Sequence, residues 1–327
     1  MAIKTMREAL GEAMSEEMRK DPKVFLMGEE VAEYDGAYKV SKGLLKEFGP
    51  KRVIDSPISE GGFAGLGVGA AMLGLKPIIE MMTWNFGIQA FDQIINHATK
   101  MCYMSAGQYP VPIVFRGPNG AAHMLSSQHS QNLDPLLANV PGLKLVSICT
   151  PADAKGLLKA SIRDDDPVIF LEHKRTYRLV KGEVPEEEYT IPIGKADIKK
   201  SGDDLSIITY GLMVHHCLEA AQLAASKNIS VEVLDLRTVR PLDVESIIGT
   251  VEKTGKVLIV YEDNQALGIG SEVSALISEH AFEYLDAPVV RLGGPEVPAM
   301  PFSPPLENMF MIDTEKISTA INKLAEY

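Results

Sequence analysis

The stretch from Arg52 to Gly69 constrains the fold of this chain more than any other. Residues Val53–Ile54 are typical of a short buried strand, and Pro57 prevents that strand from continuing. The residues from Glu60 to Leu73 are apolar enough to predict a helix that is buried all round. Glu60 is therefore expected where a strand gives way to a helix, a position at which parallel sheets commonly present functional side chains.

Three glycines of this predicted helix, Gly61, Gly65 and Gly69, recur at four-residue spacing and share one face. A glycine costs roughly 1 kcal/mol relative to alanine at a helical position, so three of them need a compensating reason. The simplest reason is the close approach of another backbone. We therefore expect a tight helix-helix contact along this face, either within the chain or between subunits; the family resemblance described below favours a contact between subunits.

Short apolar runs alternate with helical patterns through the first half of the chain. This rhythm is typical of a doubly wound parallel sheet. The runs are Val24–Met27, Arg52–Ile54, Pro77–Met82, Pro112–Phe115, Leu143–Cys149 and Val168–Leu171.

One helix start can be placed from its capping residues. Thr150 is a favoured N-cap residue, Pro151 suits the first helical position, and Asp153 adds an acid to the first turn. Apolar residues at Leu157 and Leu158 continue the pattern. These signals predict a helix that begins at Pro151.

The chain turns polar after Tyr177, and a second set of apolar runs follows. We interpret residues 177–195 as an extended linker between a first domain, residues 1–176, and a second domain, residues 196–327. The second domain is also predicted to contain a parallel α/β sheet. Its strand candidates are Leu205–Tyr210, Val231–Leu236, Val257–Tyr261 and Val289–Leu292.

Composition narrows the classes of partner. The chain has 327 residues, 46% of them hydrophobic, and a formal net charge of -12, which argues against nucleic acid and anionic membranes as partners. Its three cysteines, Cys102, Cys149 and Cys217, are widely spaced and lie in apolar surroundings, as expected of reduced thiols. No apolar run reaches about 18 residues, and no targeting signal is recognisable. We expect a soluble cytoplasmic protein.

Residues able to do chemistry follow several of the predicted strands. Because ligands of open parallel sheets bind beyond the carboxyl ends of the strands, these residues are expected to gather at one edge. Structural alternatives exist: Glu60 could simply complement the helix dipole, and Trp84 and Phe86 could be core residues. The candidates are Glu29, Glu30, Glu60, Trp84, Phe86, Arg116, His123 and His129.

Common catalytic motifs are absent from the sequence. Gly268 and Gly270 follow a predicted strand, but Val273 stands where a dinucleotide fingerprint needs its third glycine, which makes a nicotinamide oxidoreductase improbable. There is no GxxxxGK[ST] loop, CxxC pair, HExxH helix or GxSxG elbow.

The chain nevertheless resembles a known family nearly from end to end: the beta subunits of the decarboxylating component of 2-oxo acid dehydrogenase complexes. The resemblance implies a pyrimidine-type thiamine-diphosphate-binding fold followed by a transketolase C-terminal-like α/β domain. It is carried by the motifs Gly28–Tyr38, Ile54–Glu60, Phe115–Gly120, Gln128–Gln131, Leu234–Pro241 and Gly293–Pro298.

The resemblance implies roles for individual residues toward thiamine diphosphate. Glu60 matches the glutamate that hydrogen-bonds the ring nitrogen of the cofactor's aminopyrimidine, and Phe86 matches the aromatic residue that stacks on that ring. Glu29 matches an acid of a proton relay, and His129 a histidine that assists acyl transfer to lipoamide. Two further positions implied to contact the cofactor are Ile58 and Met82.

The family's magnesium and diphosphate motif is missing, because Gly202-Asp-Asp204 has the wrong third residue. The resemblance therefore implies a separate alpha subunit that holds magnesium and the diphosphate, in an alpha2beta2 tetramer. It also implies docking of the acyltransferase core at Asp286 and Tyr327. In some relatives a potassium ion is held at positions that match Ile113, Ser161, Asp164 and Asp166.

The preferred substrate is open between sister enzymes. Segments 35–43 and 294–301 resemble those of pyruvate enzymes, whereas segment 170–178 also occurs in branched-chain and acetoin relatives. We favour pyruvate. An alternative of another class is a non-catalytic assembly subunit, but the presence of Glu29, Glu60, Phe86 and His129 argues against it.

Overall fold

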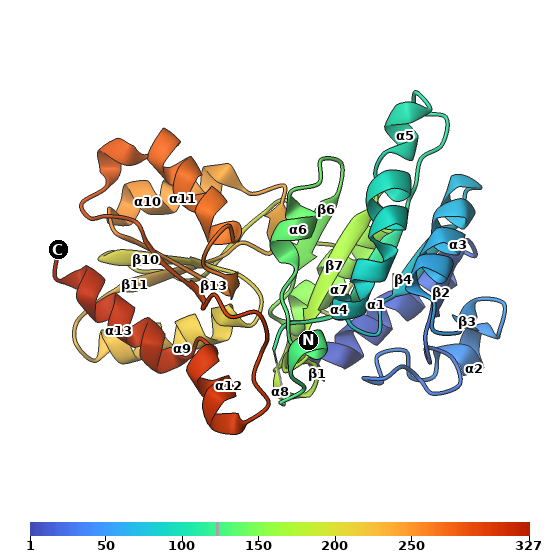
Figure 1. Ribbon diagram of the computed structural model, residues 1–327, viewed down its shortest axis with the longest axis horizontal. Helices are drawn as coiled ribbons and strands as arrows, with labels where there is room; N and C mark the ends of the chain where they lie inside the picture. Colours follow the sequence, from blue (N-terminus) through green and yellow to red (C-terminus); the bar gives the residue numbers. More distant parts are fainter. Residues whose placement is uncertain (122–123) are drawn as a thin grey trace. The chain divides into compact units, whose positions relative to one another are not determined.

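A computed structural model describes residues 1–121 and 124–327, which form two compact units (Figure 1). The first unit comprises Met1–Asn119 and Leu137–Ile193, and the second comprises Gly120–Leu136 and Gly194–Tyr327. The second unit thus includes a segment that the sequence assigned to the first domain.

The reason for this difference lies in the packing of the Gly120–Leu136 segment. Ala121 is buried in a small apolar cluster with Met300 and Met311. The hydroxyl of Ser126 donates a hydrogen bond of 3.0 Å to the carbonyl of Met300. Both partners come from the C-terminal part of the chain, so the segment folds with the second unit.

The predicted linker, residues 177–195, is largely part of the first unit. Strand β8 (Lys181–Val184) pairs antiparallel with β1 (Ala2–Thr5). Val184 is buried, and Tyr189 and Ile191 pack against the core of the unit. These apolar side chains lie between the charged residues that suggested a linker, and their burial fixes the segment.

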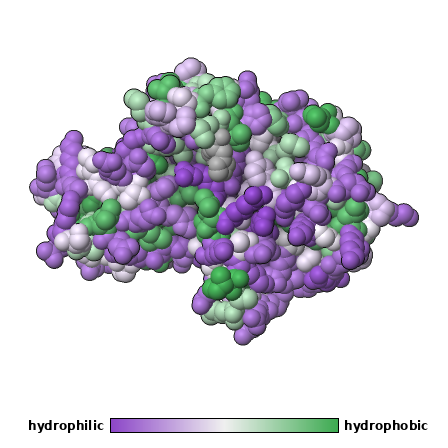
Figure 2. All heavy atoms as spheres, turned by 90° about the horizontal axis from the view of Figure 1, so that it is seen from below, coloured by the Kyte–Doolittle hydropathy of each residue, from purple (hydrophilic) through white to green (hydrophobic). Residues whose placement is uncertain are grey.

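Hydrophilic side chains predominate on the face of the protein shown in Figure 2, consistent with the formal net charge of -12. Among the described residues, no helix is both long and apolar enough to span a bilayer. The cytoplasmic location inferred from the sequence stays a prediction.

The first unit is built on a parallel sheet with the strand order β6-β7-β5-β4-β2-β3. All six predicted strands are present, which confirms the doubly wound parallel pattern. Up to residue 193 the elements are β1, α1 (Met6–Lys20), β2 (Val24–Gly28), α2 (Leu44–Phe48), β3 (Val53–Asp55), α3 (Glu60–Met72), β4 (Lys76–Glu80), α4 (Trp84–Gly87), η1 (Ile88–Ala90), η2 (Asp92–Ala98), α5 (Met101–Met104), β5 (Val114–Asn119), η3 (Ser127–His129), α6 (Asp134–Ala138), β6 (Lys144–Ser147), α7 (Pro151–Arg163), β7 (Val168–His173), α8 (Thr176–Leu179) and β8.

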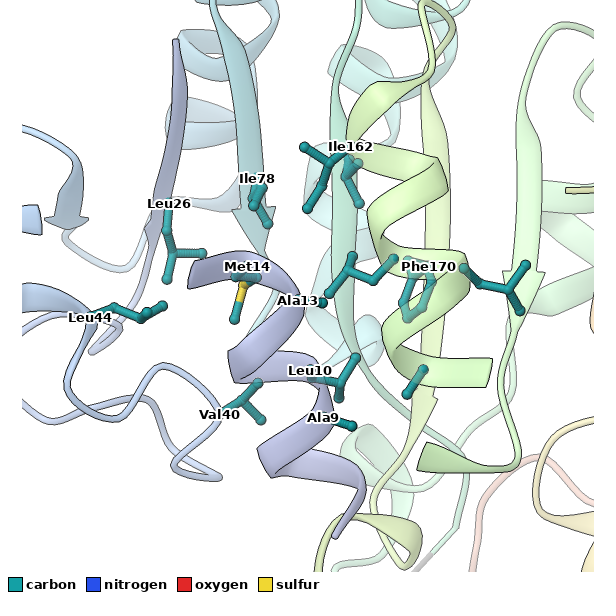
Figure 3. Close-up of a cluster of buried hydrophobic side chains, with 14 of the residues drawn as sticks. Ala9, Leu10, Ala13, Met14, Leu26, Val40, Leu44, Ile78, Ile162 and Phe170 are labelled. Carbon is teal, nitrogen blue, oxygen red and sulfur yellow. The ribbon is translucent and has the colours of Figure 1, made fainter. Parts of the chain in front are cut away.

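Helices cover both faces of this sheet. On one face α1 and α7 pack together over the strands, and their side chains form one buried cluster with Leu26, Ile78 and Phe170 (Figure 3). On the other face α3 lies so close to the sheet that a Cβ atom on Gly67 would come within 2.7 Å of the Ile79 side chain. Because Ile78 and Ile79 are neighbours in β4, they point to opposite faces, and both faces are buried.

Two lysines are buried where α1 meets α7. Lys159 is fully buried, and its ammonium lies 2.7 Å from a carboxylate oxygen of Glu16 and 2.7 Å from one of Glu188. Lys155 is 1% exposed and lies 2.8 Å from Glu16. Glu188, which also binds Arg163, fastens the segment after β8 to the two helices. A hydrogen bond from Arg163, and to a smaller extent one from Lys159, lowers the pKa of Glu188 from 4.5 to about 2.

We expect the Glu188→Gln substitution to weaken the pH dependence of folding in acid. A carboxyl group whose pKa is lowered by folding stabilises the protein above its unfolded pKa, and this contribution is lost as the pH falls from 4.5 toward 2. Because the Glu188 side chain is 57% exposed, we expect the variant to lose only about 1 kcal/mol at pH 7. Urea unfolding at pH 7 and pH 3 tests this, and an equal loss at both values would contradict it.

The second unit contains a five-stranded sheet with the order β14-β13-β10-β11-β9. Four strands are parallel, as predicted, but β9 pairs antiparallel with β11, so the sheet is mixed. From residue 194 the elements are β9 (Asp197–Lys200), β10 (Leu205–Thr209), α9 (Met213–Ala225), β11 (Val231–Asp235), β12 (Thr238–Arg240), α10 (Val244–Thr254), β13 (Val257–Asn264), α11 (Ile269–His280), η4 (Phe282–Tyr284), β14 (Val290–Gly294), α12 (Pro304–Phe310) and α13 (Thr314–Ala325).

Helices also cover both faces of the second sheet. Figure 1 shows α9 and α13 on one face and α10 and α11 on the other. The α9 and α13 face buries Cys217, Ile317 and Ile321 against Leu258 and Val260 of strand β13. Burial raises the pKa of the Cys217 thiol well above its usual range, in keeping with the unreactive buried thiol that the sequence predicted.

Candidate active site

The chain order of the strands changes direction at β2 in the first unit. The next strand, β3, lies on one side of β2, and the one after it, β4, lies on the other. Ligands of open α/β sheets bind beyond the carboxyl ends of the strands at such a point. Glu29 follows β2, Glu60 follows β3, and the segment Thr83–Phe86 follows β4. Three adjacent strand ends therefore bring together three of the sequence-predicted positions.

Glu29 and Glu60 are buried acids at this switch point, with exposed fractions of 4% and 2%. Within the described part of the chain, Oε1 of Glu29 and Oε2 of Glu60 have no hydrogen-bond partner. Burial, with a smaller effect from the charge of Glu60, raises the pKa of Glu29 from 4.5 to about 7. A carboxyl group with this pKa can both hold and release a proton near neutral pH.

The Glu29→Gln substitution is expected to stabilise the cofactor-free protein at pH 8. Because folding raises the pKa of Glu29, the folded state binds more protons than the unfolded state between pH 4.5 and about 7. The wild-type protein thus loses stability as the pH rises through this window, and a neutral glutamine avoids the loss. We expect a higher melting temperature for the variant at pH 8 and little difference at pH 5. A gain of equal size at both pH values would contradict this account.

Phe86 lies in the single-turn helix α4 and is half-buried. The preceding residues fix this turn. Trp84 is fully buried, which supports the alternative that it is a core residue. The side-chain oxygen of Asn85 accepts hydrogen bonds from the hydroxyl of Thr83 at 2.9 Å and from the ammonium of Lys174 at 3.4 Å.

The two other predicted cofactor contacts, Ile58 and Met82, come shortly before Glu60 and Phe86 in the chain. Ile58 lies between β3 and α3 and is 84% exposed, whereas Met82 follows β4 and is half-buried. An isolated apolar side chain as exposed as Ile58 gains free energy when a ligand or partner covers it. Its contact with a cofactor stays a prediction.

His129 belongs to the second unit and is exposed at the end of η3. Its backbone N–H donates a 3.2 Å hydrogen bond to the carbonyl of Ser126, a residue with a positive φ of 63°. His123, the other histidine expected after β5, lies outside the described residues. The role of His129 in acyl transfer stays a prediction.

Arg116 is not at the crevice, contrary to the expectation from the sequence. It lies inside β5, fully buried, and its guanidinium binds the carboxylates of Glu80 on β4 and Glu172 on β7. The Nε–Oε1 distance to Glu172 is 2.5 Å, and the hydroxyl of Tyr177 donates to the same carboxylate at 2.7 Å. These residues form a buried ionic network that ties three central strands together. Sequence reasoning missed Glu80 and Glu172.

The glycines of α3 have different surroundings. A Cβ atom on Gly61 would lie 3.2 Å from the carbonyl of Gln89 in η1, and one on Gly65 would lie 3.1 Å from the side chain of Gln93 in η2. The close neighbours of these two glycines thus come from the chain itself. Gly69 faces open space, beside the exposed side chains of Leu66 and Leu73. A subunit contact on this side of α3 stays a prediction.

The remaining predicted positions lie elsewhere. Asp286 and Tyr327 are both exposed in the second unit, and their role in docking stays a prediction. In the first unit, the carboxylates of Asp164 and Asp166 bind the ammonium of Lys144.

The fold and the site define a class of protein: a pyrimidine-binding unit of the transketolase type, followed by a transketolase C-terminal unit. The family model described as "Transketolase, pyrimidine binding domain" matches residues 3–180, and "Transketolase, C-terminal domain" matches residues 194–317. Within this class, the chain belongs to the family of beta subunits of 2-oxo acid dehydrogenases.

Relatives cover the whole length of the chain. The 2-oxoisovalerate dehydrogenase subunit beta of Bacillus subtilis is 50% identical over 327 residues, covering 100% of both chains. The pyruvate dehydrogenase E1 component subunit beta of Rickettsia bellii is 50% identical, covering 98% of both chains. A solved structure, a split-gene transketolase described as an inactive beta4 tetramer, matches with a TM-score of 0.78 at 22% identity and 98% coverage of both chains, and so shares the fold.

Proposed function

We propose that the chain is the beta subunit of a thiamine-diphosphate-dependent 2-oxo acid dehydrogenase, and that its substrate is pyruvate. The observation that carries this proposal is the pair of buried acids, Glu29 and Glu60, at the switch point of a transketolase-type pyrimidine-binding unit. Relatives named as pyruvate dehydrogenase subunits, about 50% identical over nearly the whole chain, support the assignment.

The residues at the site fit the aminopyrimidine end of this cofactor. Oε2 of Glu60 is buried and free of hydrogen bonds from the described residues, so it can pair with a protonated ring nitrogen. Phe86, half-buried in the turn after β4, offers an aromatic ring that can stack on the heterocycle. When bound, thiamine diphosphate would provide a carbon nucleophile for the 2-oxo carbon and an electron sink for the decarboxylation.

The acids of this chain manage a proton at the site. Glu60 holds the proton on the ring nitrogen of the aminopyrimidine. Glu29, whose pKa is about 7, can accept or donate a proton at neutral pH and would act as the relay for the proton that Glu60 holds. We assign to His129 a role in acyl transfer to the lipoyl group.

An alpha subunit completes the proposed site. The chain lacks the Gly-Asp-Gly motif that holds magnesium and the diphosphate, so that half of the cofactor needs another protein. We propose an alpha2beta2 tetramer that docks on a dihydrolipoyl acyltransferase core through Asp286 and Tyr327. The apolar residues exposed just before and along α3, Ile58, Leu66 and Leu73, support a partner on this side of the first unit.

A branched-chain 2-oxo acid is the second candidate substrate. It is favoured by the relative from Bacillus subtilis, which is named for 2-oxoisovalerate and matches the full length of the chain at 50% identity. The two candidates share the proposed site on this chain and differ only in the side chain of the substrate.

The test is turnover by the chain co-expressed with the alpha subunit encoded beside it. Thiamine-dependent turnover of pyruvate, 3-methyl-2-oxobutanoate and acetoin is measured in parallel, with Glu60→Ala as the control. We expect pyruvate to have the highest kcat/KM. A preference for 3-methyl-2-oxobutanoate or acetoin would move the protein to a sister enzyme, and turnover unaffected by Glu60→Ala would favour a non-catalytic assembly subunit.

A further inference from the structure

The ammonium of Lys144 lies between Asp164 and Asp166, two of the residues that the resemblance assigned to a potassium site. It begins β6, and its ammonium lies 2.7 and 2.8 Å from the two carboxylate oxygens of Asp164, directly after α7. It also lies 3.0 Å from a carboxylate oxygen of Asp166, in the turn that leads into β7. One ammonium thus neutralises both acids and ties the start of β6 to the turn between α7 and β7.

The other two implied ligands already have partners in the chain. The carbonyl of Ile113 accepts a 2.9 Å hydrogen bond from the N–H of Val168. The carbonyl of Ser161 accepts one of 3.3 Å from the N–H of Asp164, and the Ser161 hydroxyl donates at 2.7 Å to the carbonyl of Leu157. At the other two positions, Asp164 and Asp166, the carboxylates are occupied by the ammonium of Lys144.

The Lys144 side chain is 28% exposed, and its ammonium contacts the carboxylates of both Asp164 and Asp166. An ammonium and a potassium ion carry the same charge, and both bind carboxylate and carbonyl oxygens. The tethered ammonium has the advantage that its local concentration does not depend on the salt in the cell.

We propose that Lys144 takes the place of the potassium ion that some relatives hold, so that folding around Asp164 and Asp166 in this chain is independent of potassium. The cluster lies at the amino ends of β6 and β7, whereas Glu29, Glu60 and Phe86 follow the carboxyl ends of their strands. The inference therefore concerns the stability of the first unit and holds whichever 2-oxo acid is the substrate.

The test compares melting temperatures of the full-length chain, purified with its alpha subunit, in equal concentrations of potassium chloride and tetramethylammonium chloride. We expect the wild-type protein to melt at the same temperature in both salts. Lys144→Met removes the ammonium and leaves two acids unpaired, so the variant should melt at a lower temperature. Saturating potassium should then raise its melting temperature by about 3 °C or more relative to tetramethylammonium.

A matched control separates this effect from the general loss of a lysine-carboxylate pair. Lys253 lies 2.5 Å from the buried carboxylate of Glu232 in the second unit. Lys253→Met should destabilise the protein without any specific response to potassium. A potassium response of equal size in Lys253→Met would overturn the proposal, and so would a potassium-dependent rise in the wild-type protein.

Thallium(I), a potassium mimic with strong anomalous scattering, gives a direct readout that does not depend on stability. Crystals soaked in thallium acetate should show an anomalous peak between Asp164 and Asp166 in Lys144→Met and none there in the wild type. A peak at this position in the wild-type protein would overturn the proposal even if the variant could not be purified in a folded form.

Discussion

Substitution of Glu60 by alanine is expected to abolish most of the turnover of the assembled enzyme. The carboxyl group is 2% exposed, and Oε2 has no hydrogen-bond partner among the described residues. It is thus free to hold a proton on a cofactor ring nitrogen. Proton transfer by a positioned side chain contributes roughly 10²- to 10⁴-fold to a rate, so we expect kcat to fall by a factor in this range. Steady-state turnover with saturating thiamine diphosphate measures it.

A matched control asks whether any glutamate in the first turn of a helix would have this effect. Glu245 occupies the first turn of α10 and its side chain is 89% exposed. Glu245→Ala loses a similar interaction with the helix dipole, but it should leave kcat unchanged. A comparable loss of turnover in both variants would indicate general destabilisation, and full activity of Glu60→Ala would contradict the assigned role.

The largest effect on stability is expected from Arg116→Met. Arg116 is fully buried, and its removal leaves Glu80 and Glu172 close together without a compensating cation. Removing one partner of a buried ion pair typically costs about 3–5 kcal/mol, a large part of the free energy of unfolding of a globular domain. Chemical unfolding in urea should show a loss in this range.

Arg19 provides the control, because it binds Glu47 with the same two-pronged geometry on the surface, with side chains 55% and 40% exposed. Arg19→Met should cost less than about 1 kcal/mol. If Arg116→Met does not fold, replacement of Glu80, Arg116 and Glu172 together by apolar residues should recover a folded protein, because no buried charge is left unpaired. Equal losses in Arg116→Met and Arg19→Met would contradict the importance of burial.

Local signals in the sequence were sufficient to predict the elements that position the site. Thr150 caps α7, and its hydroxyl accepts a hydrogen bond from the N–H of Asp153, as the capping pattern predicted. Pro57 separates β3 from α3, which begins at Glu60. Because adjacent parallel strands end at one edge, the strand order alone brings Glu29 and Glu60 together. The raised pKa of Glu29, which burial and the charge of Glu60 produce, could not be predicted from the sequence. The family resemblance implied only that Glu29 belongs to a proton relay.

Features that depend on distant parts of the chain could not be predicted from the sequence. Arg116 lies 36 residues from Glu80 and 56 from Glu172, and no local pattern reveals that these charges meet inside the sheet. Lys144 is 20 residues from Asp164 in the chain. The resemblance assigned Asp164 and Asp166 to a potassium site, but it did not indicate that the ammonium of Lys144 binds them. The segment after Tyr177 resembled a linker because it is rich in charged residues. The sequence does not show that one of them, Glu188, binds Lys159 and Arg163 of α7.

The central claim is that this chain supplies the pyrimidine-binding half of a thiamine diphosphate site and needs a partner for the other half. Calorimetric titration of thiamine diphosphate with magnesium into the chain alone, the alpha subunit alone and the assembled pair tests this claim most directly. We predict tight binding to the assembled pair only, and a much weaker affinity when the beta subunit carries Glu60→Ala. Tight binding to the chain alone, or an unchanged affinity in the variant, would contradict the claim.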